Sequence, residues 1–299
     1  MSTNLLNADK RSGARAVNVV RAKAELRAAL APARRQGLAV GLVPTMGSLH
    51  EGHLSLIRAA REECDVVVMT LFVNPSQFGP GEDLDRYPRD EERDLELAAA
   101  AGVDLVYAPS VEEVYPQGFA TTVAVAGGLT DVLEGDPQRR GAEHFRGVTT
   151  VVAKLFNSVG PDVAYFGQKD AQQAVVIRRM ARDLDFPVRI AVLPTVREPD
   201  GLAMSSRNAY LEPRDRERAV ALSRALGAVA REARAVSLAA GLQAGRRELA
   251  AAGIEPEYLE ARDAADLAPV AVLGERPVLV AVAARVGAAR LIDNVVIEP

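Results

Sequence analysis

The feature that most constrains the fold is an alternation of short apolar runs with helical segments over the first 195 residues. Val-rich runs of the length found in buried strands occur at residues 38–43, 65–73, 103–108, 163–166 and 188–193, with a weaker candidate at 121–125. Helical spacing of apolar residues occurs at 17–35, 49–63, 90–101, 148–159 and 171–184. Strands that alternate with helices predict a Rossmann-like, doubly wound α/β fold around a mostly parallel sheet.

The pattern changes after about residue 195. Long helices are predicted at residues 212–234 and 238–252, and strands at 258–261, 278–284 and 291–297. Because helices and strands no longer alternate, this block is α+β. We therefore predict two domains, a Rossmann-like domain at residues 1–195 and a smaller α+β C-terminal domain at 196–299, with the linker region at 197–208.

Composition excludes several classes of protein and partner. The 299 residues are 48% hydrophobic and 25% charged, as in ordinary globular proteins. The net charge of −4 disfavours a nucleic-acid partner, and no apolar run approaches the ~20 residues that span a bilayer. Cys64 is the only cysteine, which rules out an intrachain disulfide. Residues 1–16 are interpreted as a loose arm without the apolar segment of a signal peptide, so we expect a cytoplasmic protein.

The most informative segment, PTMGSLHEGH, runs from Pro44, expected to end the first strand, into a predicted helix. Two of the three histidines, His50 and His53, lie three residues apart and share a face of its first turn. Helix N-termini bind anions, Gly52 lets a ligand approach the backbone, and imidazole donors stabilise charge on a phosphate. Nucleotide phosphate chemistry is favoured over a zinc site, because no nearby cysteine or third histidine completes one.

Three further segments carry polar side chains suited to binding. Asn74 and Gln77 follow the second strand, where neutral amides can hold a carboxylate or hydroxyl, although Asn74 can also cap a turn. Lys169 is one of only four lysines and suits a phosphate, whereas the neighbouring Asp170 can be a helix N-cap. The loop at residues 204–207 offers two hydroxyls and a guanidinium, either as a mobile lid over phosphates or as an ordinary linker.

These motifs occur in an order that one family shares. The segments after PTMGSLHEGH are FVNPSQF at residues 72–78, YPR at 87–89, HFRGV at 144–148, FGQKDAQQ at 166–173, PTVRE at 194–198, MSSRN at 204–208 and LIDN at 291–294. An H-x-G-H sequence after a first strand is similar to that of the nucleotidyl-transferring superfamily. The longer string and the ordered motifs resemble the pantothenate synthetase (pantoate–β-alanine ligase) family over almost the whole chain.

The resemblance implies ATP-dependent ligation of pantoate and β-alanine to pantothenate, with release of AMP and pyrophosphate, through an enzyme-bound pantoyl adenylate. We expect catalysis from His53, His50 and Lys169, with His53 as the proton donor. The resemblance implies pantoate or β-alanine contacts at Gln77, Gln173 and Asn74. It implies ATP binding at Met46, Gly47, His50, Gly52, His53, Gly167, Gln168, Lys169, Asp170, Val196, Met204, Ser205, Ser206 and Arg207.

The resemblance also implies a homodimer, and Mg²⁺ that enters as the ATP complex, held by phosphates and water. Two departures from the family pattern limit the assignment. The spacer before His144 is longer and lacks a proline, so either Arg139 or Arg140 serves the site, and His144 is either a structural or a substrate contact. Arg93 stands where relatives can carry an acidic residue, so no protein metal ligands are assigned, and residues 90–94 are interpreted as a charged helix face.

Two alternatives stay open on sequence alone. Another H-x-G-H adenylyltransferase would share the histidines but need not carry Gln77, Gln173 or the C-terminal block. A catalytically silent ATP-binding protein would be expected to lose His53 or Lys169, and both are present.

Overall fold

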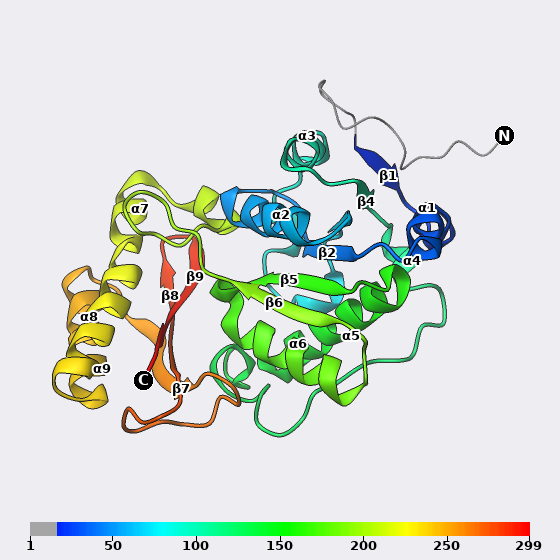
Figure 1. Cartoon of the computed structure of the whole chain (residues 1–299). Helices are drawn as coiled ribbons and strands as arrows, with labels where there is room; N and C mark the ends of the chain where they lie inside the picture. The colour runs from blue at the N-terminus through cyan, green and yellow to red at the C-terminus, as the bar shows by residue number, and fades with distance from the viewer. Residues whose placement is uncertain (1–16) are drawn as a thin grey trace. The chain divides into compact units, whose positions relative to one another are not determined.

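The computed structural model describes residues 17–299, so the arm predicted at residues 1–16 lies outside the described part (Figure 1). A six-stranded sheet has the order β1-β4-β3-β2-β5-β6. Its strands are β1 (Asn18–Val20), β2 (Val40–Thr45), β3 (Val66–Leu71), β4 (Leu105–Tyr107), β5 (Val163–Gly167) and β6 (Arg189–Leu193). The pairs β1–β4, β4–β3, β3–β2 and β2–β5 are parallel, which confirms the predicted α/β fold.

Helices cover both faces of this sheet (Figure 1). They are α1 (Lys23–Arg35), α2 (Glu51–Glu63), α3 (Glu91–Ala101), α4 (Val111–Val114), α5 (Gly141–Val159) and α6 (Ala171–Asp183). Successive strand residues point to opposite faces. Leu42 and Val68 therefore pack in the cluster with α1, α5 and α6, and Val43 and Met69 pack in the cluster with α2 and α3.

The strand order reverses at β2, because β3, β4 and β1 lie to one side of it and β5 and β6 to the other. In open α/β sheets, ligands bind beyond the carboxyl ends of the strands at such a reversal. β2 ends at Thr45 and leads directly into the histidine motif, and β5 ends at Gly167, two residues before Lys169. The strand order thus puts both motifs at the sheet edge where this fold class binds ligands.

The helix predicted at residues 17–35 is wrong at its start. Residues Asn18–Val20 form β1, and α1 begins only at Lys23. The β-branched Val19 and Val20 pair with β4, where such side chains pack well. The Glu25 carboxylate accepts the two backbone N–H groups just before the helix, at 3.0 and 3.1 Å, and so fixes where the helix begins.

The first strand does not end at Pro44, as predicted, but continues through it to Thr45. Thr45 O accepts the Phe72 N–H at 3.1 Å, so the adjacent Pro44 faces the opposite side, toward β5. Pairing between β2 and β5 ends at Leu42. A backbone N–H is therefore not needed at Pro44, and the strand tolerates proline there.

The weak strand predicted at residues 121–125 is also wrong, since this segment is irregular in the structure. The Val123 N–H donates to Thr150 Oγ1 at 3.0 Å, and Val123 O accepts from Thr149 Oγ1 at 2.6 Å. Two threonines of α5 therefore satisfy the backbone groups that a neighbouring strand would otherwise bind.

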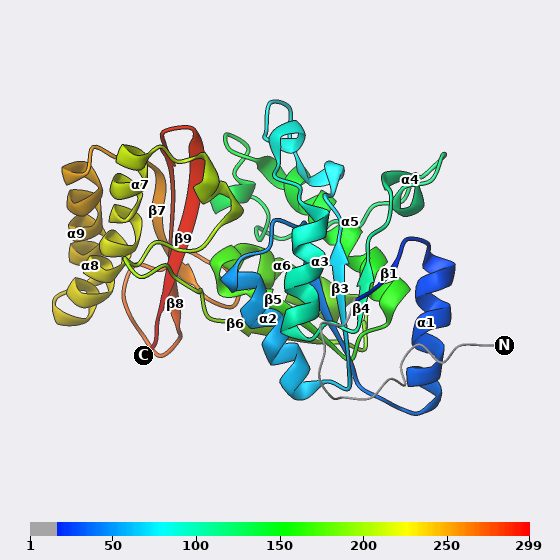
Figure 2. The same ribbon diagram turned by 90° about the horizontal axis from the view of Figure 1, so that it is seen from above.

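The C-terminal block is α+β, as predicted (Figure 2). Strands β7 (Pro256–Asp263), β8 (Val278–Val286) and β9 (Ala289–Ile297) form an antiparallel sheet covered by α7 (Pro213–Ala219), α8 (Ala221–Ala235) and α9 (Leu238–Ala251). The single helix predicted at residues 212–234 is wrong, because it is interrupted at Val220. α8 and α9 pack closely because Gly241 has no Cβ, which would lie 2.7 Å from Val229 O.

Contacts divide the chain into two compact units. Unit 1 comprises the described residues up to 125 together with 143–166 and 177–193, and unit 2 comprises 126–142, 167–176 and 194–299. The predicted boundary at residue 195 lies beside the last crossing between the units, while two earlier segments also belong to unit 2.

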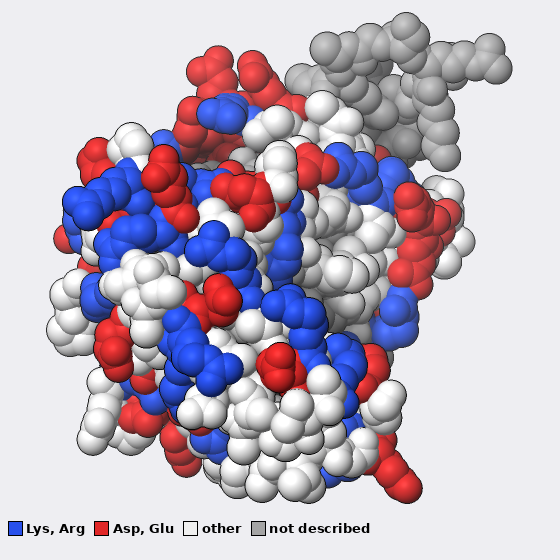
Figure 3. All heavy atoms as spheres, turned by 90° about the vertical axis from the view of Figure 1, so that its left-hand side faces the viewer, with Lys and Arg blue, Asp and Glu red and all other residues white. Residues whose placement is uncertain are grey.

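On the face shown in Figure 3, basic and acidic side chains are interspersed.

Candidate active site

The loop after β2 turns sharply at Gly47 and Ser48, whose φ angles are +85° and +51°. A Cβ at residue 47 would lie 2.8 Å from Asp94 Oδ2, so this position requires glycine. The Asp94 carboxylate accepts the N–H of Ser48 at 2.8 Å and that of Leu49 at 2.7 Å. Asp94 therefore holds the backbone that leads into His50.

Asp94 lies in α3 and is only 2% exposed, so the predicted charged helix face at residues 90–94 is wrong at this position. Burial raises the pKa of Asp94, and the hydrogen bonds from Leu49 and Ser48 only partly oppose that shift. From its position in α3, Asp94 supports the loop that leads to the two histidines.

The two histidines begin α2. His50 is the N-cap, and its Nδ1 accepts the N–H of Gly52 at 3.1 Å. His53 Nδ1 accepts the N–H of His50 at 3.3 Å. A neutral imidazole that accepts at Nδ1 carries its proton on Nε2. The two half-buried rings, 4.1 Å apart, therefore carry two Nε2–H donors at the positive end of a helix dipole.

A second polar group follows β3. Asn74, which is 1% exposed, caps the 3₁₀ turn η1 (Pro75–Gln77) and donates from Nδ2 to Gln77 Oε1 at 3.1 Å. Gln77 Nε2 lies 3.1 Å from Met46 Sδ, in the loop after β2. The structure thus brings Gln77 and Met46 together. Asn74 caps a turn, which is one of the two roles that its sequence position allows.

Helix α5 lies directly against this turn. The buried His144 has Nδ1 2.7 Å from Gln77 O. A Cβ at Gly147 would lie 2.1 Å from Ser76 O, so only glycine permits the contact between the helix and the turn. His144 therefore supports the backbone of Gln77. Of the two roles considered for His144, structural contact and substrate contact, this is the structural one.

The segment after β5 forms the 3₁₀ turn η4 (Gln168–Asp170). The Lys169 ammonium lies 3.6 Å from the Asp170 carboxylate. The buried Asn294 of β9 donates from Nδ2 to the carbonyls of Gln168 and Lys169 at 2.9 and 3.0 Å, and its Oδ1 accepts from Gln168 Nε2 at 3.2 Å. Asn294 therefore fixes the backbone that carries Lys169.

The segment after β6 forms a tight hairpin next to β9. The N–H of Met204 donates to Val196 O at 3.0 Å. Arg197 donates to both oxygens of the buried Asp293 carboxylate, at 2.6 and 3.0 Å. Such bidentate pairs fix geometry as well as charge. The predicted nucleotide contacts Val196 and Met204 therefore lie on a hairpin that β9 holds in place.

Ser205 begins the 3₁₀ turn η5 (Ser206–Tyr210), and its Oγ accepts the N–H of Arg207 at 3.3 Å. Asn208 Nδ2 donates to Glu198 Oε1 at 2.9 Å. The Ser205–Arg207 segment of the predicted linker therefore has a defined local structure that presents two hydroxyls and a guanidinium within three residues.

Adjacent glutamines in the first turn of α6 differ in their roles. The buried Gln172 accepts the Glu134 N–H at 3.0 Å and donates to the carbonyls of Leu129 and Val132 at 2.9 and 2.8 Å. Gln173 is half-buried, and its side chain makes no hydrogen bond to another residue in the range 17–299. Gln172 is thus structural, and Gln173 retains the hydrogen-bonding capacity that a substrate contact requires.

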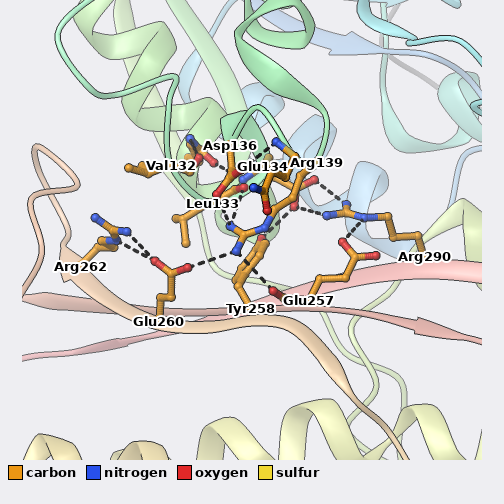
Figure 4. A network of polar contacts seen from close by, with 12 residues as sticks. Val132, Leu133, Glu134, Asp136, Arg139, Glu257, Tyr258, Glu260, Arg262 and Arg290 are labelled. Atoms are coloured by element: carbon orange, nitrogen blue, oxygen red, sulfur yellow. Dashed lines mark hydrogen bonds and ion pairs between the residues drawn. The ribbon is translucent and has the colours of Figure 1, made fainter.

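Figure 4 shows a network that holds the loop before α5 against β7 and β9. The buried Glu134 accepts from Arg290 at 2.7 and 2.8 Å and from Tyr258 OH at 2.9 Å. Burial alone would raise the pKa of Glu134, but Arg290, together with the charge of Arg140 and the Tyr258 hydrogen bond, outweighs it and leaves the pKa below its usual value. Arg139 lies 4.7 Å from the Tyr258 ring centroid and donates to Leu133 O at 2.9 Å, so Arg139 belongs to this network.

Sequence reasoning missed the supporting roles of Asp94, Asp293 and Asn294. The last two interrupt the apolar strand β9 with buried polar side chains, a signal that the pattern of residues 289–297 contains. Asp94 gives no comparable signal, because it lies among other charged residues.

Two features are absent from residues 17–299. No helix in this part of the chain is both long and apolar enough for a membrane span. No group of three or more His, Cys, Asp or Glu side chains there is placed to hold a metal ion.

Comparisons with known proteins agree with one another. The family profile described as Pantoate-beta-alanine ligase matches residues 18–296. A pantothenate synthetase of Moorella thermoacetica is 58% identical over 278 residues, which is 92% of this chain and 96% of that protein. One from Paramagnetospirillum magneticum is 54% identical over 286 residues, 95% of this chain and 99% of that protein.

Solved structures give the same result. The crystal structure of pantothenate synthetase from Thermus thermophilus aligns with a TM-score of 0.88 and 51% identity, covering 95% of this chain and 100% of that one. The pantoate-beta-alanine ligase from Francisella tularensis, crystallised with beta-gamma ATP and beta-alanine, aligns with a TM-score of 0.78 and 31% identity, covering 95% and 99%.

Proposed function

The chain belongs to the pantoate-beta-alanine ligase family, and on this premise we propose that it joins pantoate to β-alanine at the expense of ATP, giving pantothenate, AMP and pyrophosphate. The observation that carries the proposal is the start of α2, where His50 and His53 each accept a backbone N–H at Nδ1. The Francisella tularensis relative, crystallised with beta-gamma ATP and beta-alanine, supports two of the three substrates.

We propose that the reaction has two steps. The pantoate carboxylate attacks the α-phosphorus of ATP, the bond to the β-phosphate oxygen breaks, and pyrophosphate leaves. The β-alanine amine then attacks the carbonyl of the pantoyl adenylate, loses a proton, and expels AMP. A free carboxylate is a poor acyl donor to an amine, so adenylation supplies the leaving group that amide formation needs. The protein contributes mainly positioning and charge stabilisation.

The roles of the histidines follow from their tautomer. With Nδ1 committed to the backbone, each ring can donate only from Nε2. We assign both Nε2–H groups to phosphate oxygens, where negative charge grows as pyrophosphate leaves. We propose that His53 donates a hydrogen bond from Nε2–H to the leaving pyrophosphate and keeps its proton, because a neutral ring that lost the Nε2 proton would be left as imidazolate.

The remaining ATP contacts lie on segments that β9 holds. Lys169, with its backbone fixed by Asn294, and the hydroxyl and guanidinium groups of residues 205–207 are proposed to offset charge on ATP and pyrophosphate.

Gln77 and Gln173 are the proposed pantoate contacts. Gln77 carries an Nε2 donor whose orientation is set by Asn74, and the Gln173 side chain has no hydrogen bond to another residue in the range 17–299. Asn74 is buried, so we assign it to the support of Gln77 beside any direct contact with pantoate or β-alanine.

We propose that Mg²⁺ enters with the ATP phosphates and water, since the described residues offer no cluster of three carboxylate or imidazole ligands. The buried Asp94 is committed to two backbone N–H groups and does not fit a metal ligand. A homodimer and a cytoplasmic location are further proposals that rest on the resemblance alone.

Exchange of labelled pyrophosphate into ATP, with β-alanine left out, tests the first step. Exchange that requires pantoate is expected, and addition of β-alanine should then yield pantothenate and AMP. Nucleotide binding without exchange would favour a catalytically silent protein. Exchange that requires a different acceptor would point to another adenylyltransferase.

Two matched variants test the assignment of His53. His53→Asn keeps an acceptor for the His50 N–H but removes Nε2, and it should lower pantoate-dependent exchange by about 10²–10³-fold with an unchanged melting temperature. His53→Gln places a side-chain nitrogen near the Nε2 position and should retain more of the exchange. Equal exchange in both variants and the native protein would refute the role of His53 as a hydrogen-bond donor to the leaving group.

A further inference from the structure

Tyr115 stands directly after α4 (Val111–Val114), outside every motif assigned to binding. Its ring packs against Phe72 and Phe119, with centroids 6.3 and 5.1 Å away. The Lys154 ammonium lies 4.4 Å from the Phe119 ring centroid and 5.8 Å from that of Tyr115. These contacts hold the ring in one place, so the position of its hydroxyl is fixed by packing.

The Tyr115 hydroxyl donates to Asn74 Oδ1 at 2.7 Å and lies 3.0 Å from Ser76 Oγ. On the other side of the same amide, Asn74 Nδ2 donates to Gln77 Oε1 at 3.1 Å and to Gly147 O at 3.2 Å. Because a carbonyl can only accept, this set of partners fixes which end of the Asn74 amide is nitrogen.

The orientation of Asn74 determines that of Gln77. A Gln77 amide that accepts at Oε1 presents its nitrogen as the donor. Pantoate offers a carboxylate and hydroxyl oxygens, and the carboxylate requires donors. A flipped Gln77 would present an oxygen to that carboxylate and repel it. Burial raises the pKa of Tyr115, which keeps its hydroxyl protonated as a donor.

We propose that Tyr115 is a positioning residue for pantoate, acting through Asn74 to hold the donor of Gln77 in place. This inference rests on the proposed function, in which Gln77 contacts pantoate. The hydroxyl contributes a hydrogen bond, and the ring and its packing remain when only the hydroxyl is removed.

Steady-state kinetics of Tyr115→Phe, Gln77→Ala and the double variant test the proposal. Tyr115→Phe should raise the KM for pantoate by about 3–10-fold, which corresponds to the loss of one hydrogen bond, and leave the KM for ATP unchanged. In the Gln77→Ala background the same substitution should have no further effect, because its target is gone. Tyr165→Phe, which removes a buried hydroxyl bonded to Glu63 in the same unit, is the matched control and should leave the KM for pantoate unchanged.

The outcomes separate this inference from the proposed function. If Gln77→Ala raises the KM for pantoate but Tyr115→Phe does not, or if the two effects multiply in the double variant, the inference is wrong and the pantoate site stands. An effect of Tyr165→Phe equal to that of Tyr115→Phe would show a general loss of stability and also overturn it. If Gln77→Ala has no effect, both the proposed role of Gln77 and the inference fail.

Discussion

Asp94 is the buried carboxylate whose protonation links the histidine loop to pH. Its folded pKa lies above the ordinary value of 3.8, because burial disfavours the charged form. Between these two values the native state keeps a proton that the unfolded state has released. The contribution of Asp94 to the free energy of unfolding is therefore full below pH 3.8 and falls as pH rises through the folded pKa.

Asp94→Asn removes this titration while leaving an oxygen for one of the two backbone N–H groups. We expect the unfolding free energy of the native protein, relative to the variant, to fall as pH rises above 3.8 and to level off above the folded pKa, with a slope no steeper than about 1.4 kcal/mol per pH unit. Urea unfolding of both proteins across this range measures the difference. A difference that stays level or grows with pH would contradict the assignment.

At the same scale, the sequence predicts residues whose chemistry follows from type and spacing. His50 and His53 share a helix turn by spacing alone, and the structure places them together. The sequence does not predict residues whose role depends on contacts with residues far away along the chain. Asp94 contacts the loop 45 residues before it, and Asn294 contacts Lys169 from 125 residues away, distances over which local pattern carries no information.

Among the contacts between secondary-structure elements, the packing of α5 against the turn η1 sets the shape of the proposed pantoate site. Alanine normally stabilises a helix interior relative to glycine by about 0.5–1 kcal/mol. At Gly147 a Cβ would lie 2.1 Å from Ser76 O, so the helix or the turn must move. We expect Gly147→Ala to destabilise the protein by about 1–3 kcal/mol and to raise the KM for pantoate.

Gly227→Ala in α8 is the control, since its nearest neighbour is the flexible Arg231 Nη1 at 3.4 Å. It should stabilise the protein by about 0.5–1 kcal/mol, as helix propensity predicts. Chemical unfolding of both variants gives the comparison. Equal stabilisation by both substitutions would mean that the Gly147 contact does not constrain the turn.

The sequence predicts the type of an element where one apolar pattern extends over the whole element, but it does not predict the residues at which the element begins and ends. The strands β2 to β5 follow from short apolar runs because they are buried on both faces of the sheet, and the edge strand β6 is apolar enough to be predicted although it is only partly buried. The sequence predicts a helix at residues 18–20 because Val19 and Val20 fit either periodicity, and only their pairing with β4 makes this segment a strand. The break at Val220 leaves no mark in an otherwise amphipathic pattern.

At the scale of the whole molecule, the chain crosses between the two units several times. A fragment that ends at Thr195 keeps Glu134 but lacks Tyr258 and Arg290, so segment 126–142 loses the ion pair and the hydrogen bond that hold it against β7 and β9. Breaking a buried ion pair costs about 3–5 kcal/mol. We therefore expect the fragment 1–195 not to unfold as a cooperative unit, as measured by near-ultraviolet circular dichroism during thermal unfolding.

Co-expression of residues 196–299 supplies the missing partners and is the control for that fragment. The mixture should recover cooperative unfolding. A fragment 1–195 that unfolds alone, with the midpoint of the full chain, would show that segments 126–142 and 167–176 do not need the later strands.

The dependence of Lys169 on Asn294 also has a consequence for biosynthesis. Asn294 follows Gln168 by 126 residues. At about 5–20 residues per second, ribosomes need roughly 6–25 s to make that interval. The nascent chain thus carries its Lys169 turn for that time before β9 exists to hold it. A synonymous codon change that slows translation between these positions lengthens the exposure of the turn without altering a single contact in the finished protein.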